Sequence, residues 1–507
     1  MIEKPPNPVP PVLEKHIRYG NSYGKSELYW GLGIECESYF EMSKPVDVVG
    51  RFILDNQKRE RYSVDYYTSY KQPALTNALS NVATAHPRMQ VPMLVNAHAF
   101  TKMNKFGEHK TLYKKGAPPN PSFVGQTLFE RLQLKDPKFF KDQYETKFTF
   151  DGDSIEIMTQ DFYRATVKKV VAEFVETRRR FLDALQKIFT ENQYLSEYGT
   201  IQWAQKNHGF AVMATNPSNT AIFNNGTYHI NITLPTMLND EGKIANFTLF
   251  EQQHRAMIRA IQWLEPMLVG AFGSADILAS VSKGFALGSQ RGAMSRYIGI
   301  GTYDTNKMEK GKLLAIPIAD VKSTWYKDYH ADSSYNALTE VGFDINFNKH
   351  WNHGIEIRFF DWFPEGRLSG LLRMLVYLAD VAVDEIDIVD PLSNKVWNAW
   401  MVRVIQKGAA AGVTSAEALL LTKVFSIPCR ADKDLNAFFA DFYCTIAKKW
   451  KGKGPCSRHF LSDEVVVPTP SPINQTPVES GGICMPSAPR EPAWTFRSFV
   501  TWLFGGR

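Results

Sequence analysis

Four separate segments of the chain alternate apolar and polar residues, which is the period of a β-strand with one buried face. The segments are YWGLGIECESYF, FDGDSIEIMT, YHINITLP and HGIEIRFFDWFP. Solvent-facing strands usually carry Lys, Thr, Ser and Gln at their polar positions. These segments instead carry acids, an imidazole, an amide and a guanidinium group: Glu35, Glu37, Glu156, His229, Asn231, Glu356 and Arg358. We therefore expect the four strands to lie in one sheet and to turn these side chains into a shared basin.

The residue types in this basin are those of a magnesium–nucleotide site. Glu35 and Glu37 are two residues apart on one strand, which places their carboxylates about 7 Å apart on the same face. Mg²⁺ takes carboxylate oxygens together with nucleotide phosphates, and an arginine such as Arg358 can stabilise a phosphoryl group during transfer. The sequence contains no GxxxxGK[ST] segment, so we expect ATP chemistry without a P-loop. Each strand taken alone is also compatible with an ordinary surface strand.

Three helices are expected from apolar spacing. One follows Thr159, an expected N-cap with Asp161 in the first turn. A second runs over about residues 249–264 and is expected to stop at Pro266. A third is expected over residues 366–383 and is apolar on most sides, which indicates a buried helix.

Proline content predicts the domain boundaries. Five prolines in the first dozen residues indicate an extended arm at 1–13, and the pattern from 14 to 464 is that of one continuous domain with an insert at 41–147. Seven prolines between Pro468 and Pro492 indicate a disordered linker at 465–492. The tail at 493–507 is amphipathic and aromatic, so it is expected to dock on a membrane surface, on a protein partner or on its own domain.

Composition excludes several classes of protein. The net charge of +6 is spread thinly, and the cluster Lys448, Lys449, Lys451 and Lys453 is more typical of a solvated helix end than of a nucleic-acid surface. We expect no specific nucleic acid as a partner. The first residues lack the apolar core of a signal peptide, and no run of apolar residues is long enough for a transmembrane segment. A cytoplasmic location is therefore expected.

The order of the motifs resembles that of the glutamate–cysteine ligase and amidoligase group of the glutamine-synthetase-like carboxylate–amine ligase superfamily. GIECE is similar to that family's Gly-x-Glu-x-Glu strand, SIEIMT to its second metal-binding strand and YHINITLP to its His-x-Asn strand. AIQWLEPMLVGAFGSADI and GSQRGAMSRYIGIGTYD resemble the helix and the substrate-binding segment that follow, and IEIRFFDWFP resembles the Glu-x-Arg-x-x-Asp-x-x-Pro strand that closes the site. The resemblance covers about residues 28–385. It implies an α+β fold with a curved, mostly antiparallel sheet and helices on its outer face.

The resemblance also implies a role for each matching residue. The metal ligands, for two or three Mg²⁺ ions that bridge the ATP phosphates, would be Glu35, Glu37, Glu156 and Glu356. His229 would lie at the phosphates or at a metal, and Arg358 would stabilise the γ-phosphoryl group, so that Arg358, Glu356 and His229 form the catalytic set. The substrate-binding residues would be Arg296, or else Arg291, for a carboxylate, together with Asn231. A further acid of the family corresponds to either Asp151 or Asp153.

The implied reaction joins an amino-acid or peptide carboxylate to an amine acceptor. The carboxylate would attack ATP to give an acyl phosphate and ADP, and the amine would displace phosphate to form a γ-glutamyl or peptide-like amide. Two alternatives stay open: a ligase-derived, non-catalytic scaffold or virion-type interaction protein, and a kinase that releases an acyl or guanidino phosphate. The amidoligase branch includes members from large DNA viruses, so association with a virion is the alternative location. Cys36, between the two glutamates on the apolar face, is expected to pack in the core.

Overall fold

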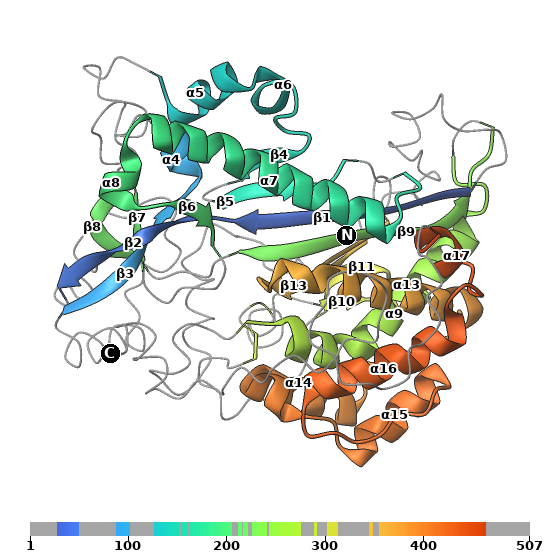
Figure 1. The fold of residues 1–507 in the computed structure, drawn as a ribbon. Helices are drawn as coiled ribbons and strands as arrows, with labels where there is room; N and C mark the ends of the chain where they lie inside the picture. Colours follow the sequence, from blue (N-terminus) through green and yellow to red (C-terminus); the bar gives the residue numbers. More distant parts are fainter. Residues whose placement is uncertain are drawn as a thin grey trace, which may run out of the picture.

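The structure is a computed structural model of the 507-residue chain. It describes residues 28–49, 88–101, 126–151, 154–160, 163–204, 211–214, 216–221, 226–240, 243–274, 288–289, 291, 302–312, 344–347 and 354–462. The expected arm at 1–13, linker at 465–492 and tail at 493–507 lie outside the described residues, as does Arg296. Helices and antiparallel sheets are mixed along the chain, so the fold is α+β, as expected (Figure 1).

Six strands form the sheet that carries the predicted acidic residues, and every neighbouring pair in it is antiparallel. Strands from distant parts of the chain are neighbours, because β9 lies between β1 and β13. In sheet order the strands are β12 (Ile345–Asn346), β13 (Ile355–Asp361), β9 (Thr227–Met237), β1 (Leu28–Ser38), β5 (Ser154–Met158) and β4 (Phe148–Asp151).

A second sheet continues from the end of β1. Its β2–β3, β2–β6 and β7–β8 pairs are antiparallel and its β3–β7 pair is parallel. In sheet order its strands are β6 (Ile201–Trp203), β2 (Phe40–Val49), β3 (Arg88–Val95), β7 (Ala211–Met213) and β8 (Asn216–Ala221). Two strands of the expected insert at 41–147 therefore pair with strands from 201–221. A further hairpin consists of β10 (Thr302–Asp304) and β11 (Glu309–Lys312).

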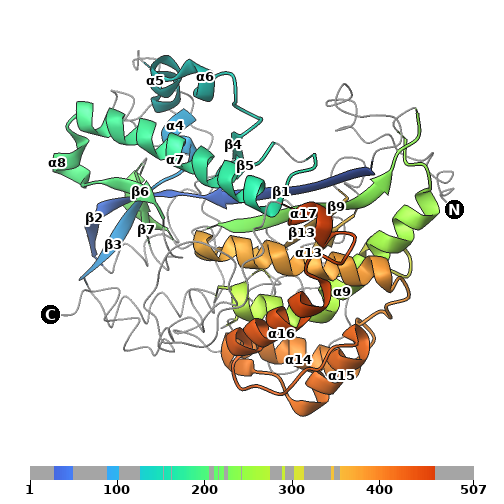
Figure 2. The same cartoon turned by 45° about the vertical axis from the view of Figure 1, so that its right-hand side comes forward.

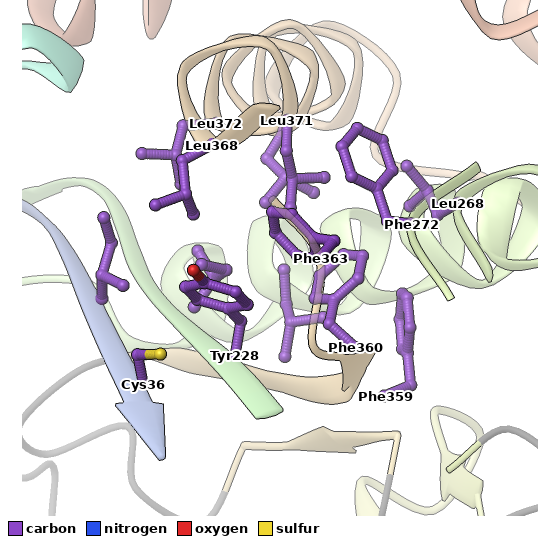
Figure 3. Packing of buried hydrophobic residues seen from close by; sticks show 14 of the residues in the cluster. Cys36, Tyr228, Leu268, Phe272, Phe359, Phe360, Phe363, Leu368, Leu371 and Leu372 are labelled. Atoms are coloured by element: carbon purple, nitrogen blue, oxygen red, sulfur yellow. The ribbon is translucent and has the colours of Figure 1, made fainter. Parts of the chain in front are cut away.

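Long helices cover the apolar face of the six-stranded sheet. α7 (Val167–Glu191) contacts β1 and β5, and α9 (Phe247–Phe272) contacts β9 and β13. α13 (Leu368–Asp384) follows the short 3₁₀ helix η4 (Glu365–Arg367) and packs on both α7 and α9. Figure 3 shows Cys36 and Tyr228 on the sheet facing the leucines of α13, with Phe360 and Phe363 beside them. Cys36 is fully buried there, as expected for a core residue.

Most of the C-terminal helices pack against α9 and α13 (Figure 2), whereas the last of them, α17, lies against Trp30 of β1. They are α14 (Lys395–Lys407), the 3₁₀ helix η5 (Gly408–Ala411), α15 (Ser415–Phe425), α16 (Leu435–Trp450) and α17 (Ser457–Phe460). The shorter helices elsewhere are α4 (Ala97–Thr101), α5 (Leu128–Lys135), α6 (Pro137–Phe140) and α8 (Tyr194–Tyr198). Within the described residues, no helix is both long and apolar enough to cross a membrane.

The expected end of the second helix is wrong, because α9 continues through Pro266 to Phe272. Proline lacks the N–H that would bond the carbonyl four residues earlier, which here belongs to Gln262. The indole of Trp397, on α14, donates to that carbonyl at 2.8 Å. The helix therefore tolerates the proline because a side chain from a neighbouring helix replaces the missing donor.

The expected start of the first helix is also wrong. α7 begins after Thr166, whose hydroxyl accepts from the amide of Lys169 as an N-cap. The hydroxyl of Thr159 instead accepts from the amide of Ile34 on β1 at 2.9 Å. Thr159 therefore extends the sheet and does not start the helix. The third helix, expected at 366–383, is confirmed by η4 and α13.

Candidate metal centre

The register of the six-stranded sheet places the predicted polar residues on one face. Glu35 lies opposite His229 in the β1–β9 pair, and Glu37 lies opposite Glu156 in the β1–β5 pair. Glu356 lies opposite Asn231 in the β13–β9 pair. Directly opposite residues share a face, and so do residues two apart on a strand. The structure thus brings these residues together, although they come from four strands spread over more than 300 residues of sequence.

Glu35, His229 and Glu356 form the centre of this face, which we call the triad. Nδ1 of His229 lies 3.5 Å from Oε2 of Glu35 and 3.7 Å from Oε1 of Glu356. One potential ligand atom from each residue lies within 4.8 Å of the other two. These separations suit one divalent cation held by two carboxylates and an imidazole.

The polar face, which the sequence predicted to form a shared basin, is largely buried. Glu356 is completely buried, and His229 and Asn231 are only 3% and 1% exposed. Glu35 and Glu37 keep partial exposure. A buried carboxylate needs a counter-charge or a hydrogen-bond donor, so the partners of the triad are informative.

Amide side chains orient both carboxylates of the triad. Nδ2 of Asn231 donates to Oε1 of Glu35 at 2.9 Å, and Nδ2 of Asn346 donates to Oε2 of Glu356 at 3.0 Å. Since a carboxylate accepts only, Asn231 must turn its nitrogen to Glu35. Its Oδ1 is then buried and has no hydrogen-bond partner in the part of the chain that the structure describes. An orphaned oxygen beside two carboxylates fits a cation or one of its water ligands.

Glu37 and Glu156 extend the acidic face beyond the triad. The pKa of Glu37 is raised, chiefly because its carboxyl is buried. The charges of Asp151 and Glu35 raise this pKa further, whereas the guanidinium groups of Arg291 and Arg358 oppose the shift. Asp151 ends β4 and is exposed. Of the two acids left open by the sequence, Asp151 therefore acts on Glu37, and Asp153 lies outside the described residues. The half-buried Glu156 is the cross-strand neighbour of Glu37, which gives a second pair of carboxylates.

Arg358 pairs directly with a carboxylate of the triad. Its Nη1 donates to Oε1 of Glu356 at 2.5 Å. Burial acts to lower the pKa of Arg358, but Glu356 and Glu37 outweigh it and the pKa is raised. Its Nε is buried and has no hydrogen-bond partner among the described residues. Arg358 is thus a fixed cation whose Nε–H is still available as a donor within the described part of the chain.

Arg291 approaches the same face from a different segment. Its Nε donates to the main-chain oxygen of Arg358 at 2.8 Å, and Nη2 lies 3.2 Å from Nε2 of His229. The sequence had favoured Arg296 over Arg291 as the substrate-binding residue. The structure places Arg291 at the site, whereas Arg296 lies outside the described residues.

Asp361 anchors the segment that carries Arg291. Its carboxylate is completely buried and accepts from the hydroxyl of Ser289 at 2.6 Å and from the amides of Ser274 and Arg291 at 3.1 Å. Burial raises the pKa of Asp361, and these hydrogen bonds oppose that effect. The sequence gives no signal for Ser289, Asn346 or Thr227, whose Oγ1 lies 3.4 Å from Nε2 of His229, because a single serine, asparagine or threonine carries no motif of its own.

The predicted glutamates outnumber the arginines at this face, so the site carries a net negative formal charge. Glu35, Glu37, Glu156 and Glu356 face Arg291 and Arg358, which leaves an excess of two negative charges. Divalent cations would offset that excess. Carboxylates, an imidazole and an orphaned amide oxygen therefore fit a divalent metal in donor type and in charge.

Comparison with known proteins gives a viral relative. No family model matches the chain. The chain is 35% identical over 471 residues to the uncharacterized protein R704 of Acanthamoeba polyphaga mimivirus, and the match covers 92% of this chain and 82% of the relative. The chain belongs to the same family as that viral protein.

Proposed function

We propose that this protein is an ATP- and magnesium-dependent carboxylate–amine ligase with a glutamine-synthetase-like catalytic fold. The observation that carries the proposal is the triad, in which Glu35, His229 and Glu356 offer ligand atoms within 4.8 Å of one another on a buried polar face. Two features support it further. The motif order resembles that of the glutamate–cysteine ligase and amidoligase group, and the sheet is antiparallel with helices on its other face.

The acidic face offers two places for metal ions. Glu35, Glu356 and His229 would hold one cation, and Glu37 with Glu156 would hold another, with Asp151 close to Glu37. Bound Mg²⁺ would neutralise the phosphates of ATP and polarise the γ-phosphoryl group. Asn231 and Asn346 keep the carboxylates in place for this role.

The two arginines would handle the anionic groups of the reaction. Arg358 would direct its unused Nε–H to an oxygen of the γ-phosphoryl group, where charge develops during transfer. Arg291 would bind the substrate carboxylate through parallel hydrogen bonds. One oxygen of that carboxylate attacks the γ-phosphorus and ADP leaves. The nitrogen of the amine then attacks the acyl carbon, phosphate leaves, and the amine gives up a proton.

One observation favours the non-catalytic alternative. Arg358 already pairs with Glu356, and Arg291 already contacts His229. A scaffold protein that had lost the reaction would keep such pairs to stabilise a buried polar layer, because unpaired buried charges are costly. In a ligase, Arg358 and Arg291 would give up these contacts to bind a nucleotide or a substrate, whereas in a scaffold protein they would keep them.

An assay of ADP release tests the proposal directly. The full chain would be incubated with ATP and Mg²⁺ and a panel of amino acids and short peptides, with and without an amine acceptor. A ligase releases ADP only when a suitable carboxylate is present and forms an amide only when the amine is added. A kinase forms a stable phosphorylated product without an amine, and a scaffold releases no ADP.

Two isosteric variants link the assay to the site. Glu35→Gln and Glu156→Gln keep side-chain shape but remove a ligand charge, so each should abolish turnover while the folded protein remains. Glu176→Gln, on the exposed face of α7, is the matched control and should retain full turnover. Full activity in either site variant would discard the metal assignment.

A further inference from the structure

Arg291 is held against His229 by contacts to the end of β13. Its main-chain nitrogen donates to Oδ1 of Asp361 at 3.1 Å, and its Nε donates to the main-chain oxygen of Arg358 at 2.8 Å. The first bond docks the backbone, and the second places the side chain beside His229. Nη2 is thereby placed 3.2 Å from Nε2 of His229.

This contact determines which nitrogen of His229 carries the hydrogen. A guanidinium group has donors and no acceptor, so Nε2 must accept from Arg291. The hydrogen of the neutral ring then lies on Nδ1, which faces Oε2 of Glu35 at 3.5 Å and Oε1 of Glu356 at 3.7 Å. In this arrangement His229 turns an N–H, and not a lone pair, toward the two carboxylates.

A cation held by the triad requires the other tautomer. A ligating imidazole nitrogen must be unprotonated, so the hydrogen would lie on Nε2. That N–H cannot face the donors of Arg291, but it can donate to the hydroxyl of Thr227, whose Oγ1 lies 3.4 Å from Nε2. Ligation of a cation by Nδ1 and the contact of Arg291 with Nε2 therefore exclude each other.

We infer that Arg291 couples cation binding to carboxylate binding at this site. When His229 presents Nδ1 to a divalent cation, the guanidinium of Arg291 leaves Nε2 and becomes available to an anion. The inference rests on the proposed function, because it assumes the cation site. The released group fits a carboxylate, which guanidinium binds with two parallel hydrogen bonds.

Asp361 keeps the released side chain at the site. It holds the main chain of Arg291 and, through Ser289 and Ser274, the neighbouring segments. The side chain can therefore change partner while its backbone stays docked on β13. Because coupling between two ligands is reciprocal, the cation strengthens carboxylate binding by the factor by which the carboxylate strengthens cation binding.

A magnesium titration of the full chain labelled with ¹⁵N-histidine tests the tautomer change. Two-bond ¹H–¹⁵N spectra show which ring nitrogen carries the hydrogen, and His229→Gln assigns the signal. We expect the hydrogen of His229 on Nδ1 without Mg²⁺ and on Nε2 with Mg²⁺. The same titration gives the affinity for Mg²⁺.

Two variants should change that affinity in opposite directions. Arg291→Gln removes the competitor for Nε2 and should tighten Mg²⁺ binding about tenfold, and Thr227→Val removes the acceptor for Nε2–H and should weaken it about tenfold, in the range usual for partners of metal ligands. Loss of positive charge alone would explain the first change but not the second. Acetate, as a carboxylate probe, should bind more tightly with Mg²⁺ in the wild type, and this gain should shrink in Arg291→Gln.

The outcomes separate the inference from the proposed function. If Mg²⁺ binds but His229 keeps its hydrogen on Nδ1, or if Thr227→Val has the wild-type affinity, the coupling through Arg291 is wrong and the metal site stands. If neither the wild type nor Arg291→Gln binds Mg²⁺ at millimolar concentrations, both the metal site and the coupling are wrong.

Discussion

Asn231 donates a hydrogen bond to Glu35 across the β9–β1 pair, with 2.9 Å between Nδ2 and Oε1. The same asparagine lies directly opposite Glu356 in the β9–β13 pair. Residues of three strands are thus held in one polar layer by the sheet itself. Sites built on strands hold their geometry better than sites on loops, so single substitutions in this layer should alter chemistry more than folding.

Arg358→Lys should retain the positive charge near Glu356 but lose the Nε–H donor that is proposed to contact the γ-phosphoryl group. A lysine ammonium cannot reproduce the planar fork of a guanidinium group. We expect ADP release to fall about 10³-fold, the lower end of what an arginine contributes to phosphoryl transfer. Arg179→Lys, at an exposed ion pair on α7, is the matched control and should behave as the wild type. Undiminished turnover in Arg358→Lys would remove this residue from the proposed mechanism.

Cys36 should be chemically inert in the folded protein, although it lies between Glu35 and Glu37 in the sequence. Burial raises the pKa of its thiol to about 12, so almost no thiolate exists at pH 8. Labelling by iodoacetamide would be followed by mass spectrometry. We expect Cys36 to be labelled only after the protein unfolds, and the half-buried Cys429 to be labelled sooner. Cys36→Ala should keep ADP release. Rapid labelling that ATP prevents would instead indicate a reactive thiol at the site.

Asp380 should make stability depend on pH. Burial raises the pKa of its carboxyl from 3.8 to about 6, while hydrogen bonds from Ser457 and the amide of Cys456 oppose that shift. The folded protein therefore holds a proton that the unfolded chain releases, so this stabilisation is complete below pH 4 and is lost as the pH rises through 6. The full stabilisation at low pH is about 3 kcal/mol, because each unit of pKa shift corresponds to about 1.4 kcal/mol.

Urea unfolding of the wild type and Asp380→Asn between pH 4 and 8 checks this dependence. The free energy of unfolding of the wild type should fall relative to that of the variant as the pH rises through 6. Asp384→Asn, an exposed acid at the end of the same helix, should follow the wild type. Parallel curves for the wild type and Asp380→Asn would show that Asp380 does not titrate near pH 6.

Trp397 and Pro266 should be energetically coupled through the carbonyl of Gln262. Trp397→Phe removes the donor to that buried oxygen and should lower the free energy of unfolding by about 1–3 kcal/mol, the cost of an unsatisfied buried acceptor. Pro266→Ala restores a main-chain N–H within α9 and should recover part of that loss in the double variant. A double-mutant cycle by urea unfolding measures the coupling. Strictly additive effects would contradict it.

The sequence predicted the polar layer because the pattern there is local. Alternation along each strand places Glu35, Glu37 and His229 on the side opposite to Cys36, and the structure agrees. The sequence could not predict that this side is buried, since burial depends on which groups pack over it. Asn346 and Thr227 support the triad only through the sheet register, which no single segment contains.

The errors in the helices have the same origin. Pro266 was expected to end α9, and a partner on another helix, Trp397, removes that constraint. Thr159 has the composition of an N-cap, but β1 uses its hydroxyl. The second sheet was also out of reach, because β2 and β3 pair with β6 and β7 over more than 100 residues of sequence. Contacts between distant segments decided each of these features.

Binding of Mn²⁺ to the purified chain, measured by electron paramagnetic resonance, tests the central claim most directly. Wild type and Glu356→Gln would be compared, with Glu176→Gln as the control at an exposed position. The proposed metal centre predicts that the wild type and the control bind Mn²⁺ equally and that Glu356→Gln binds at least about tenfold more weakly. Equal binding by all three proteins would contradict a metal centre at the triad.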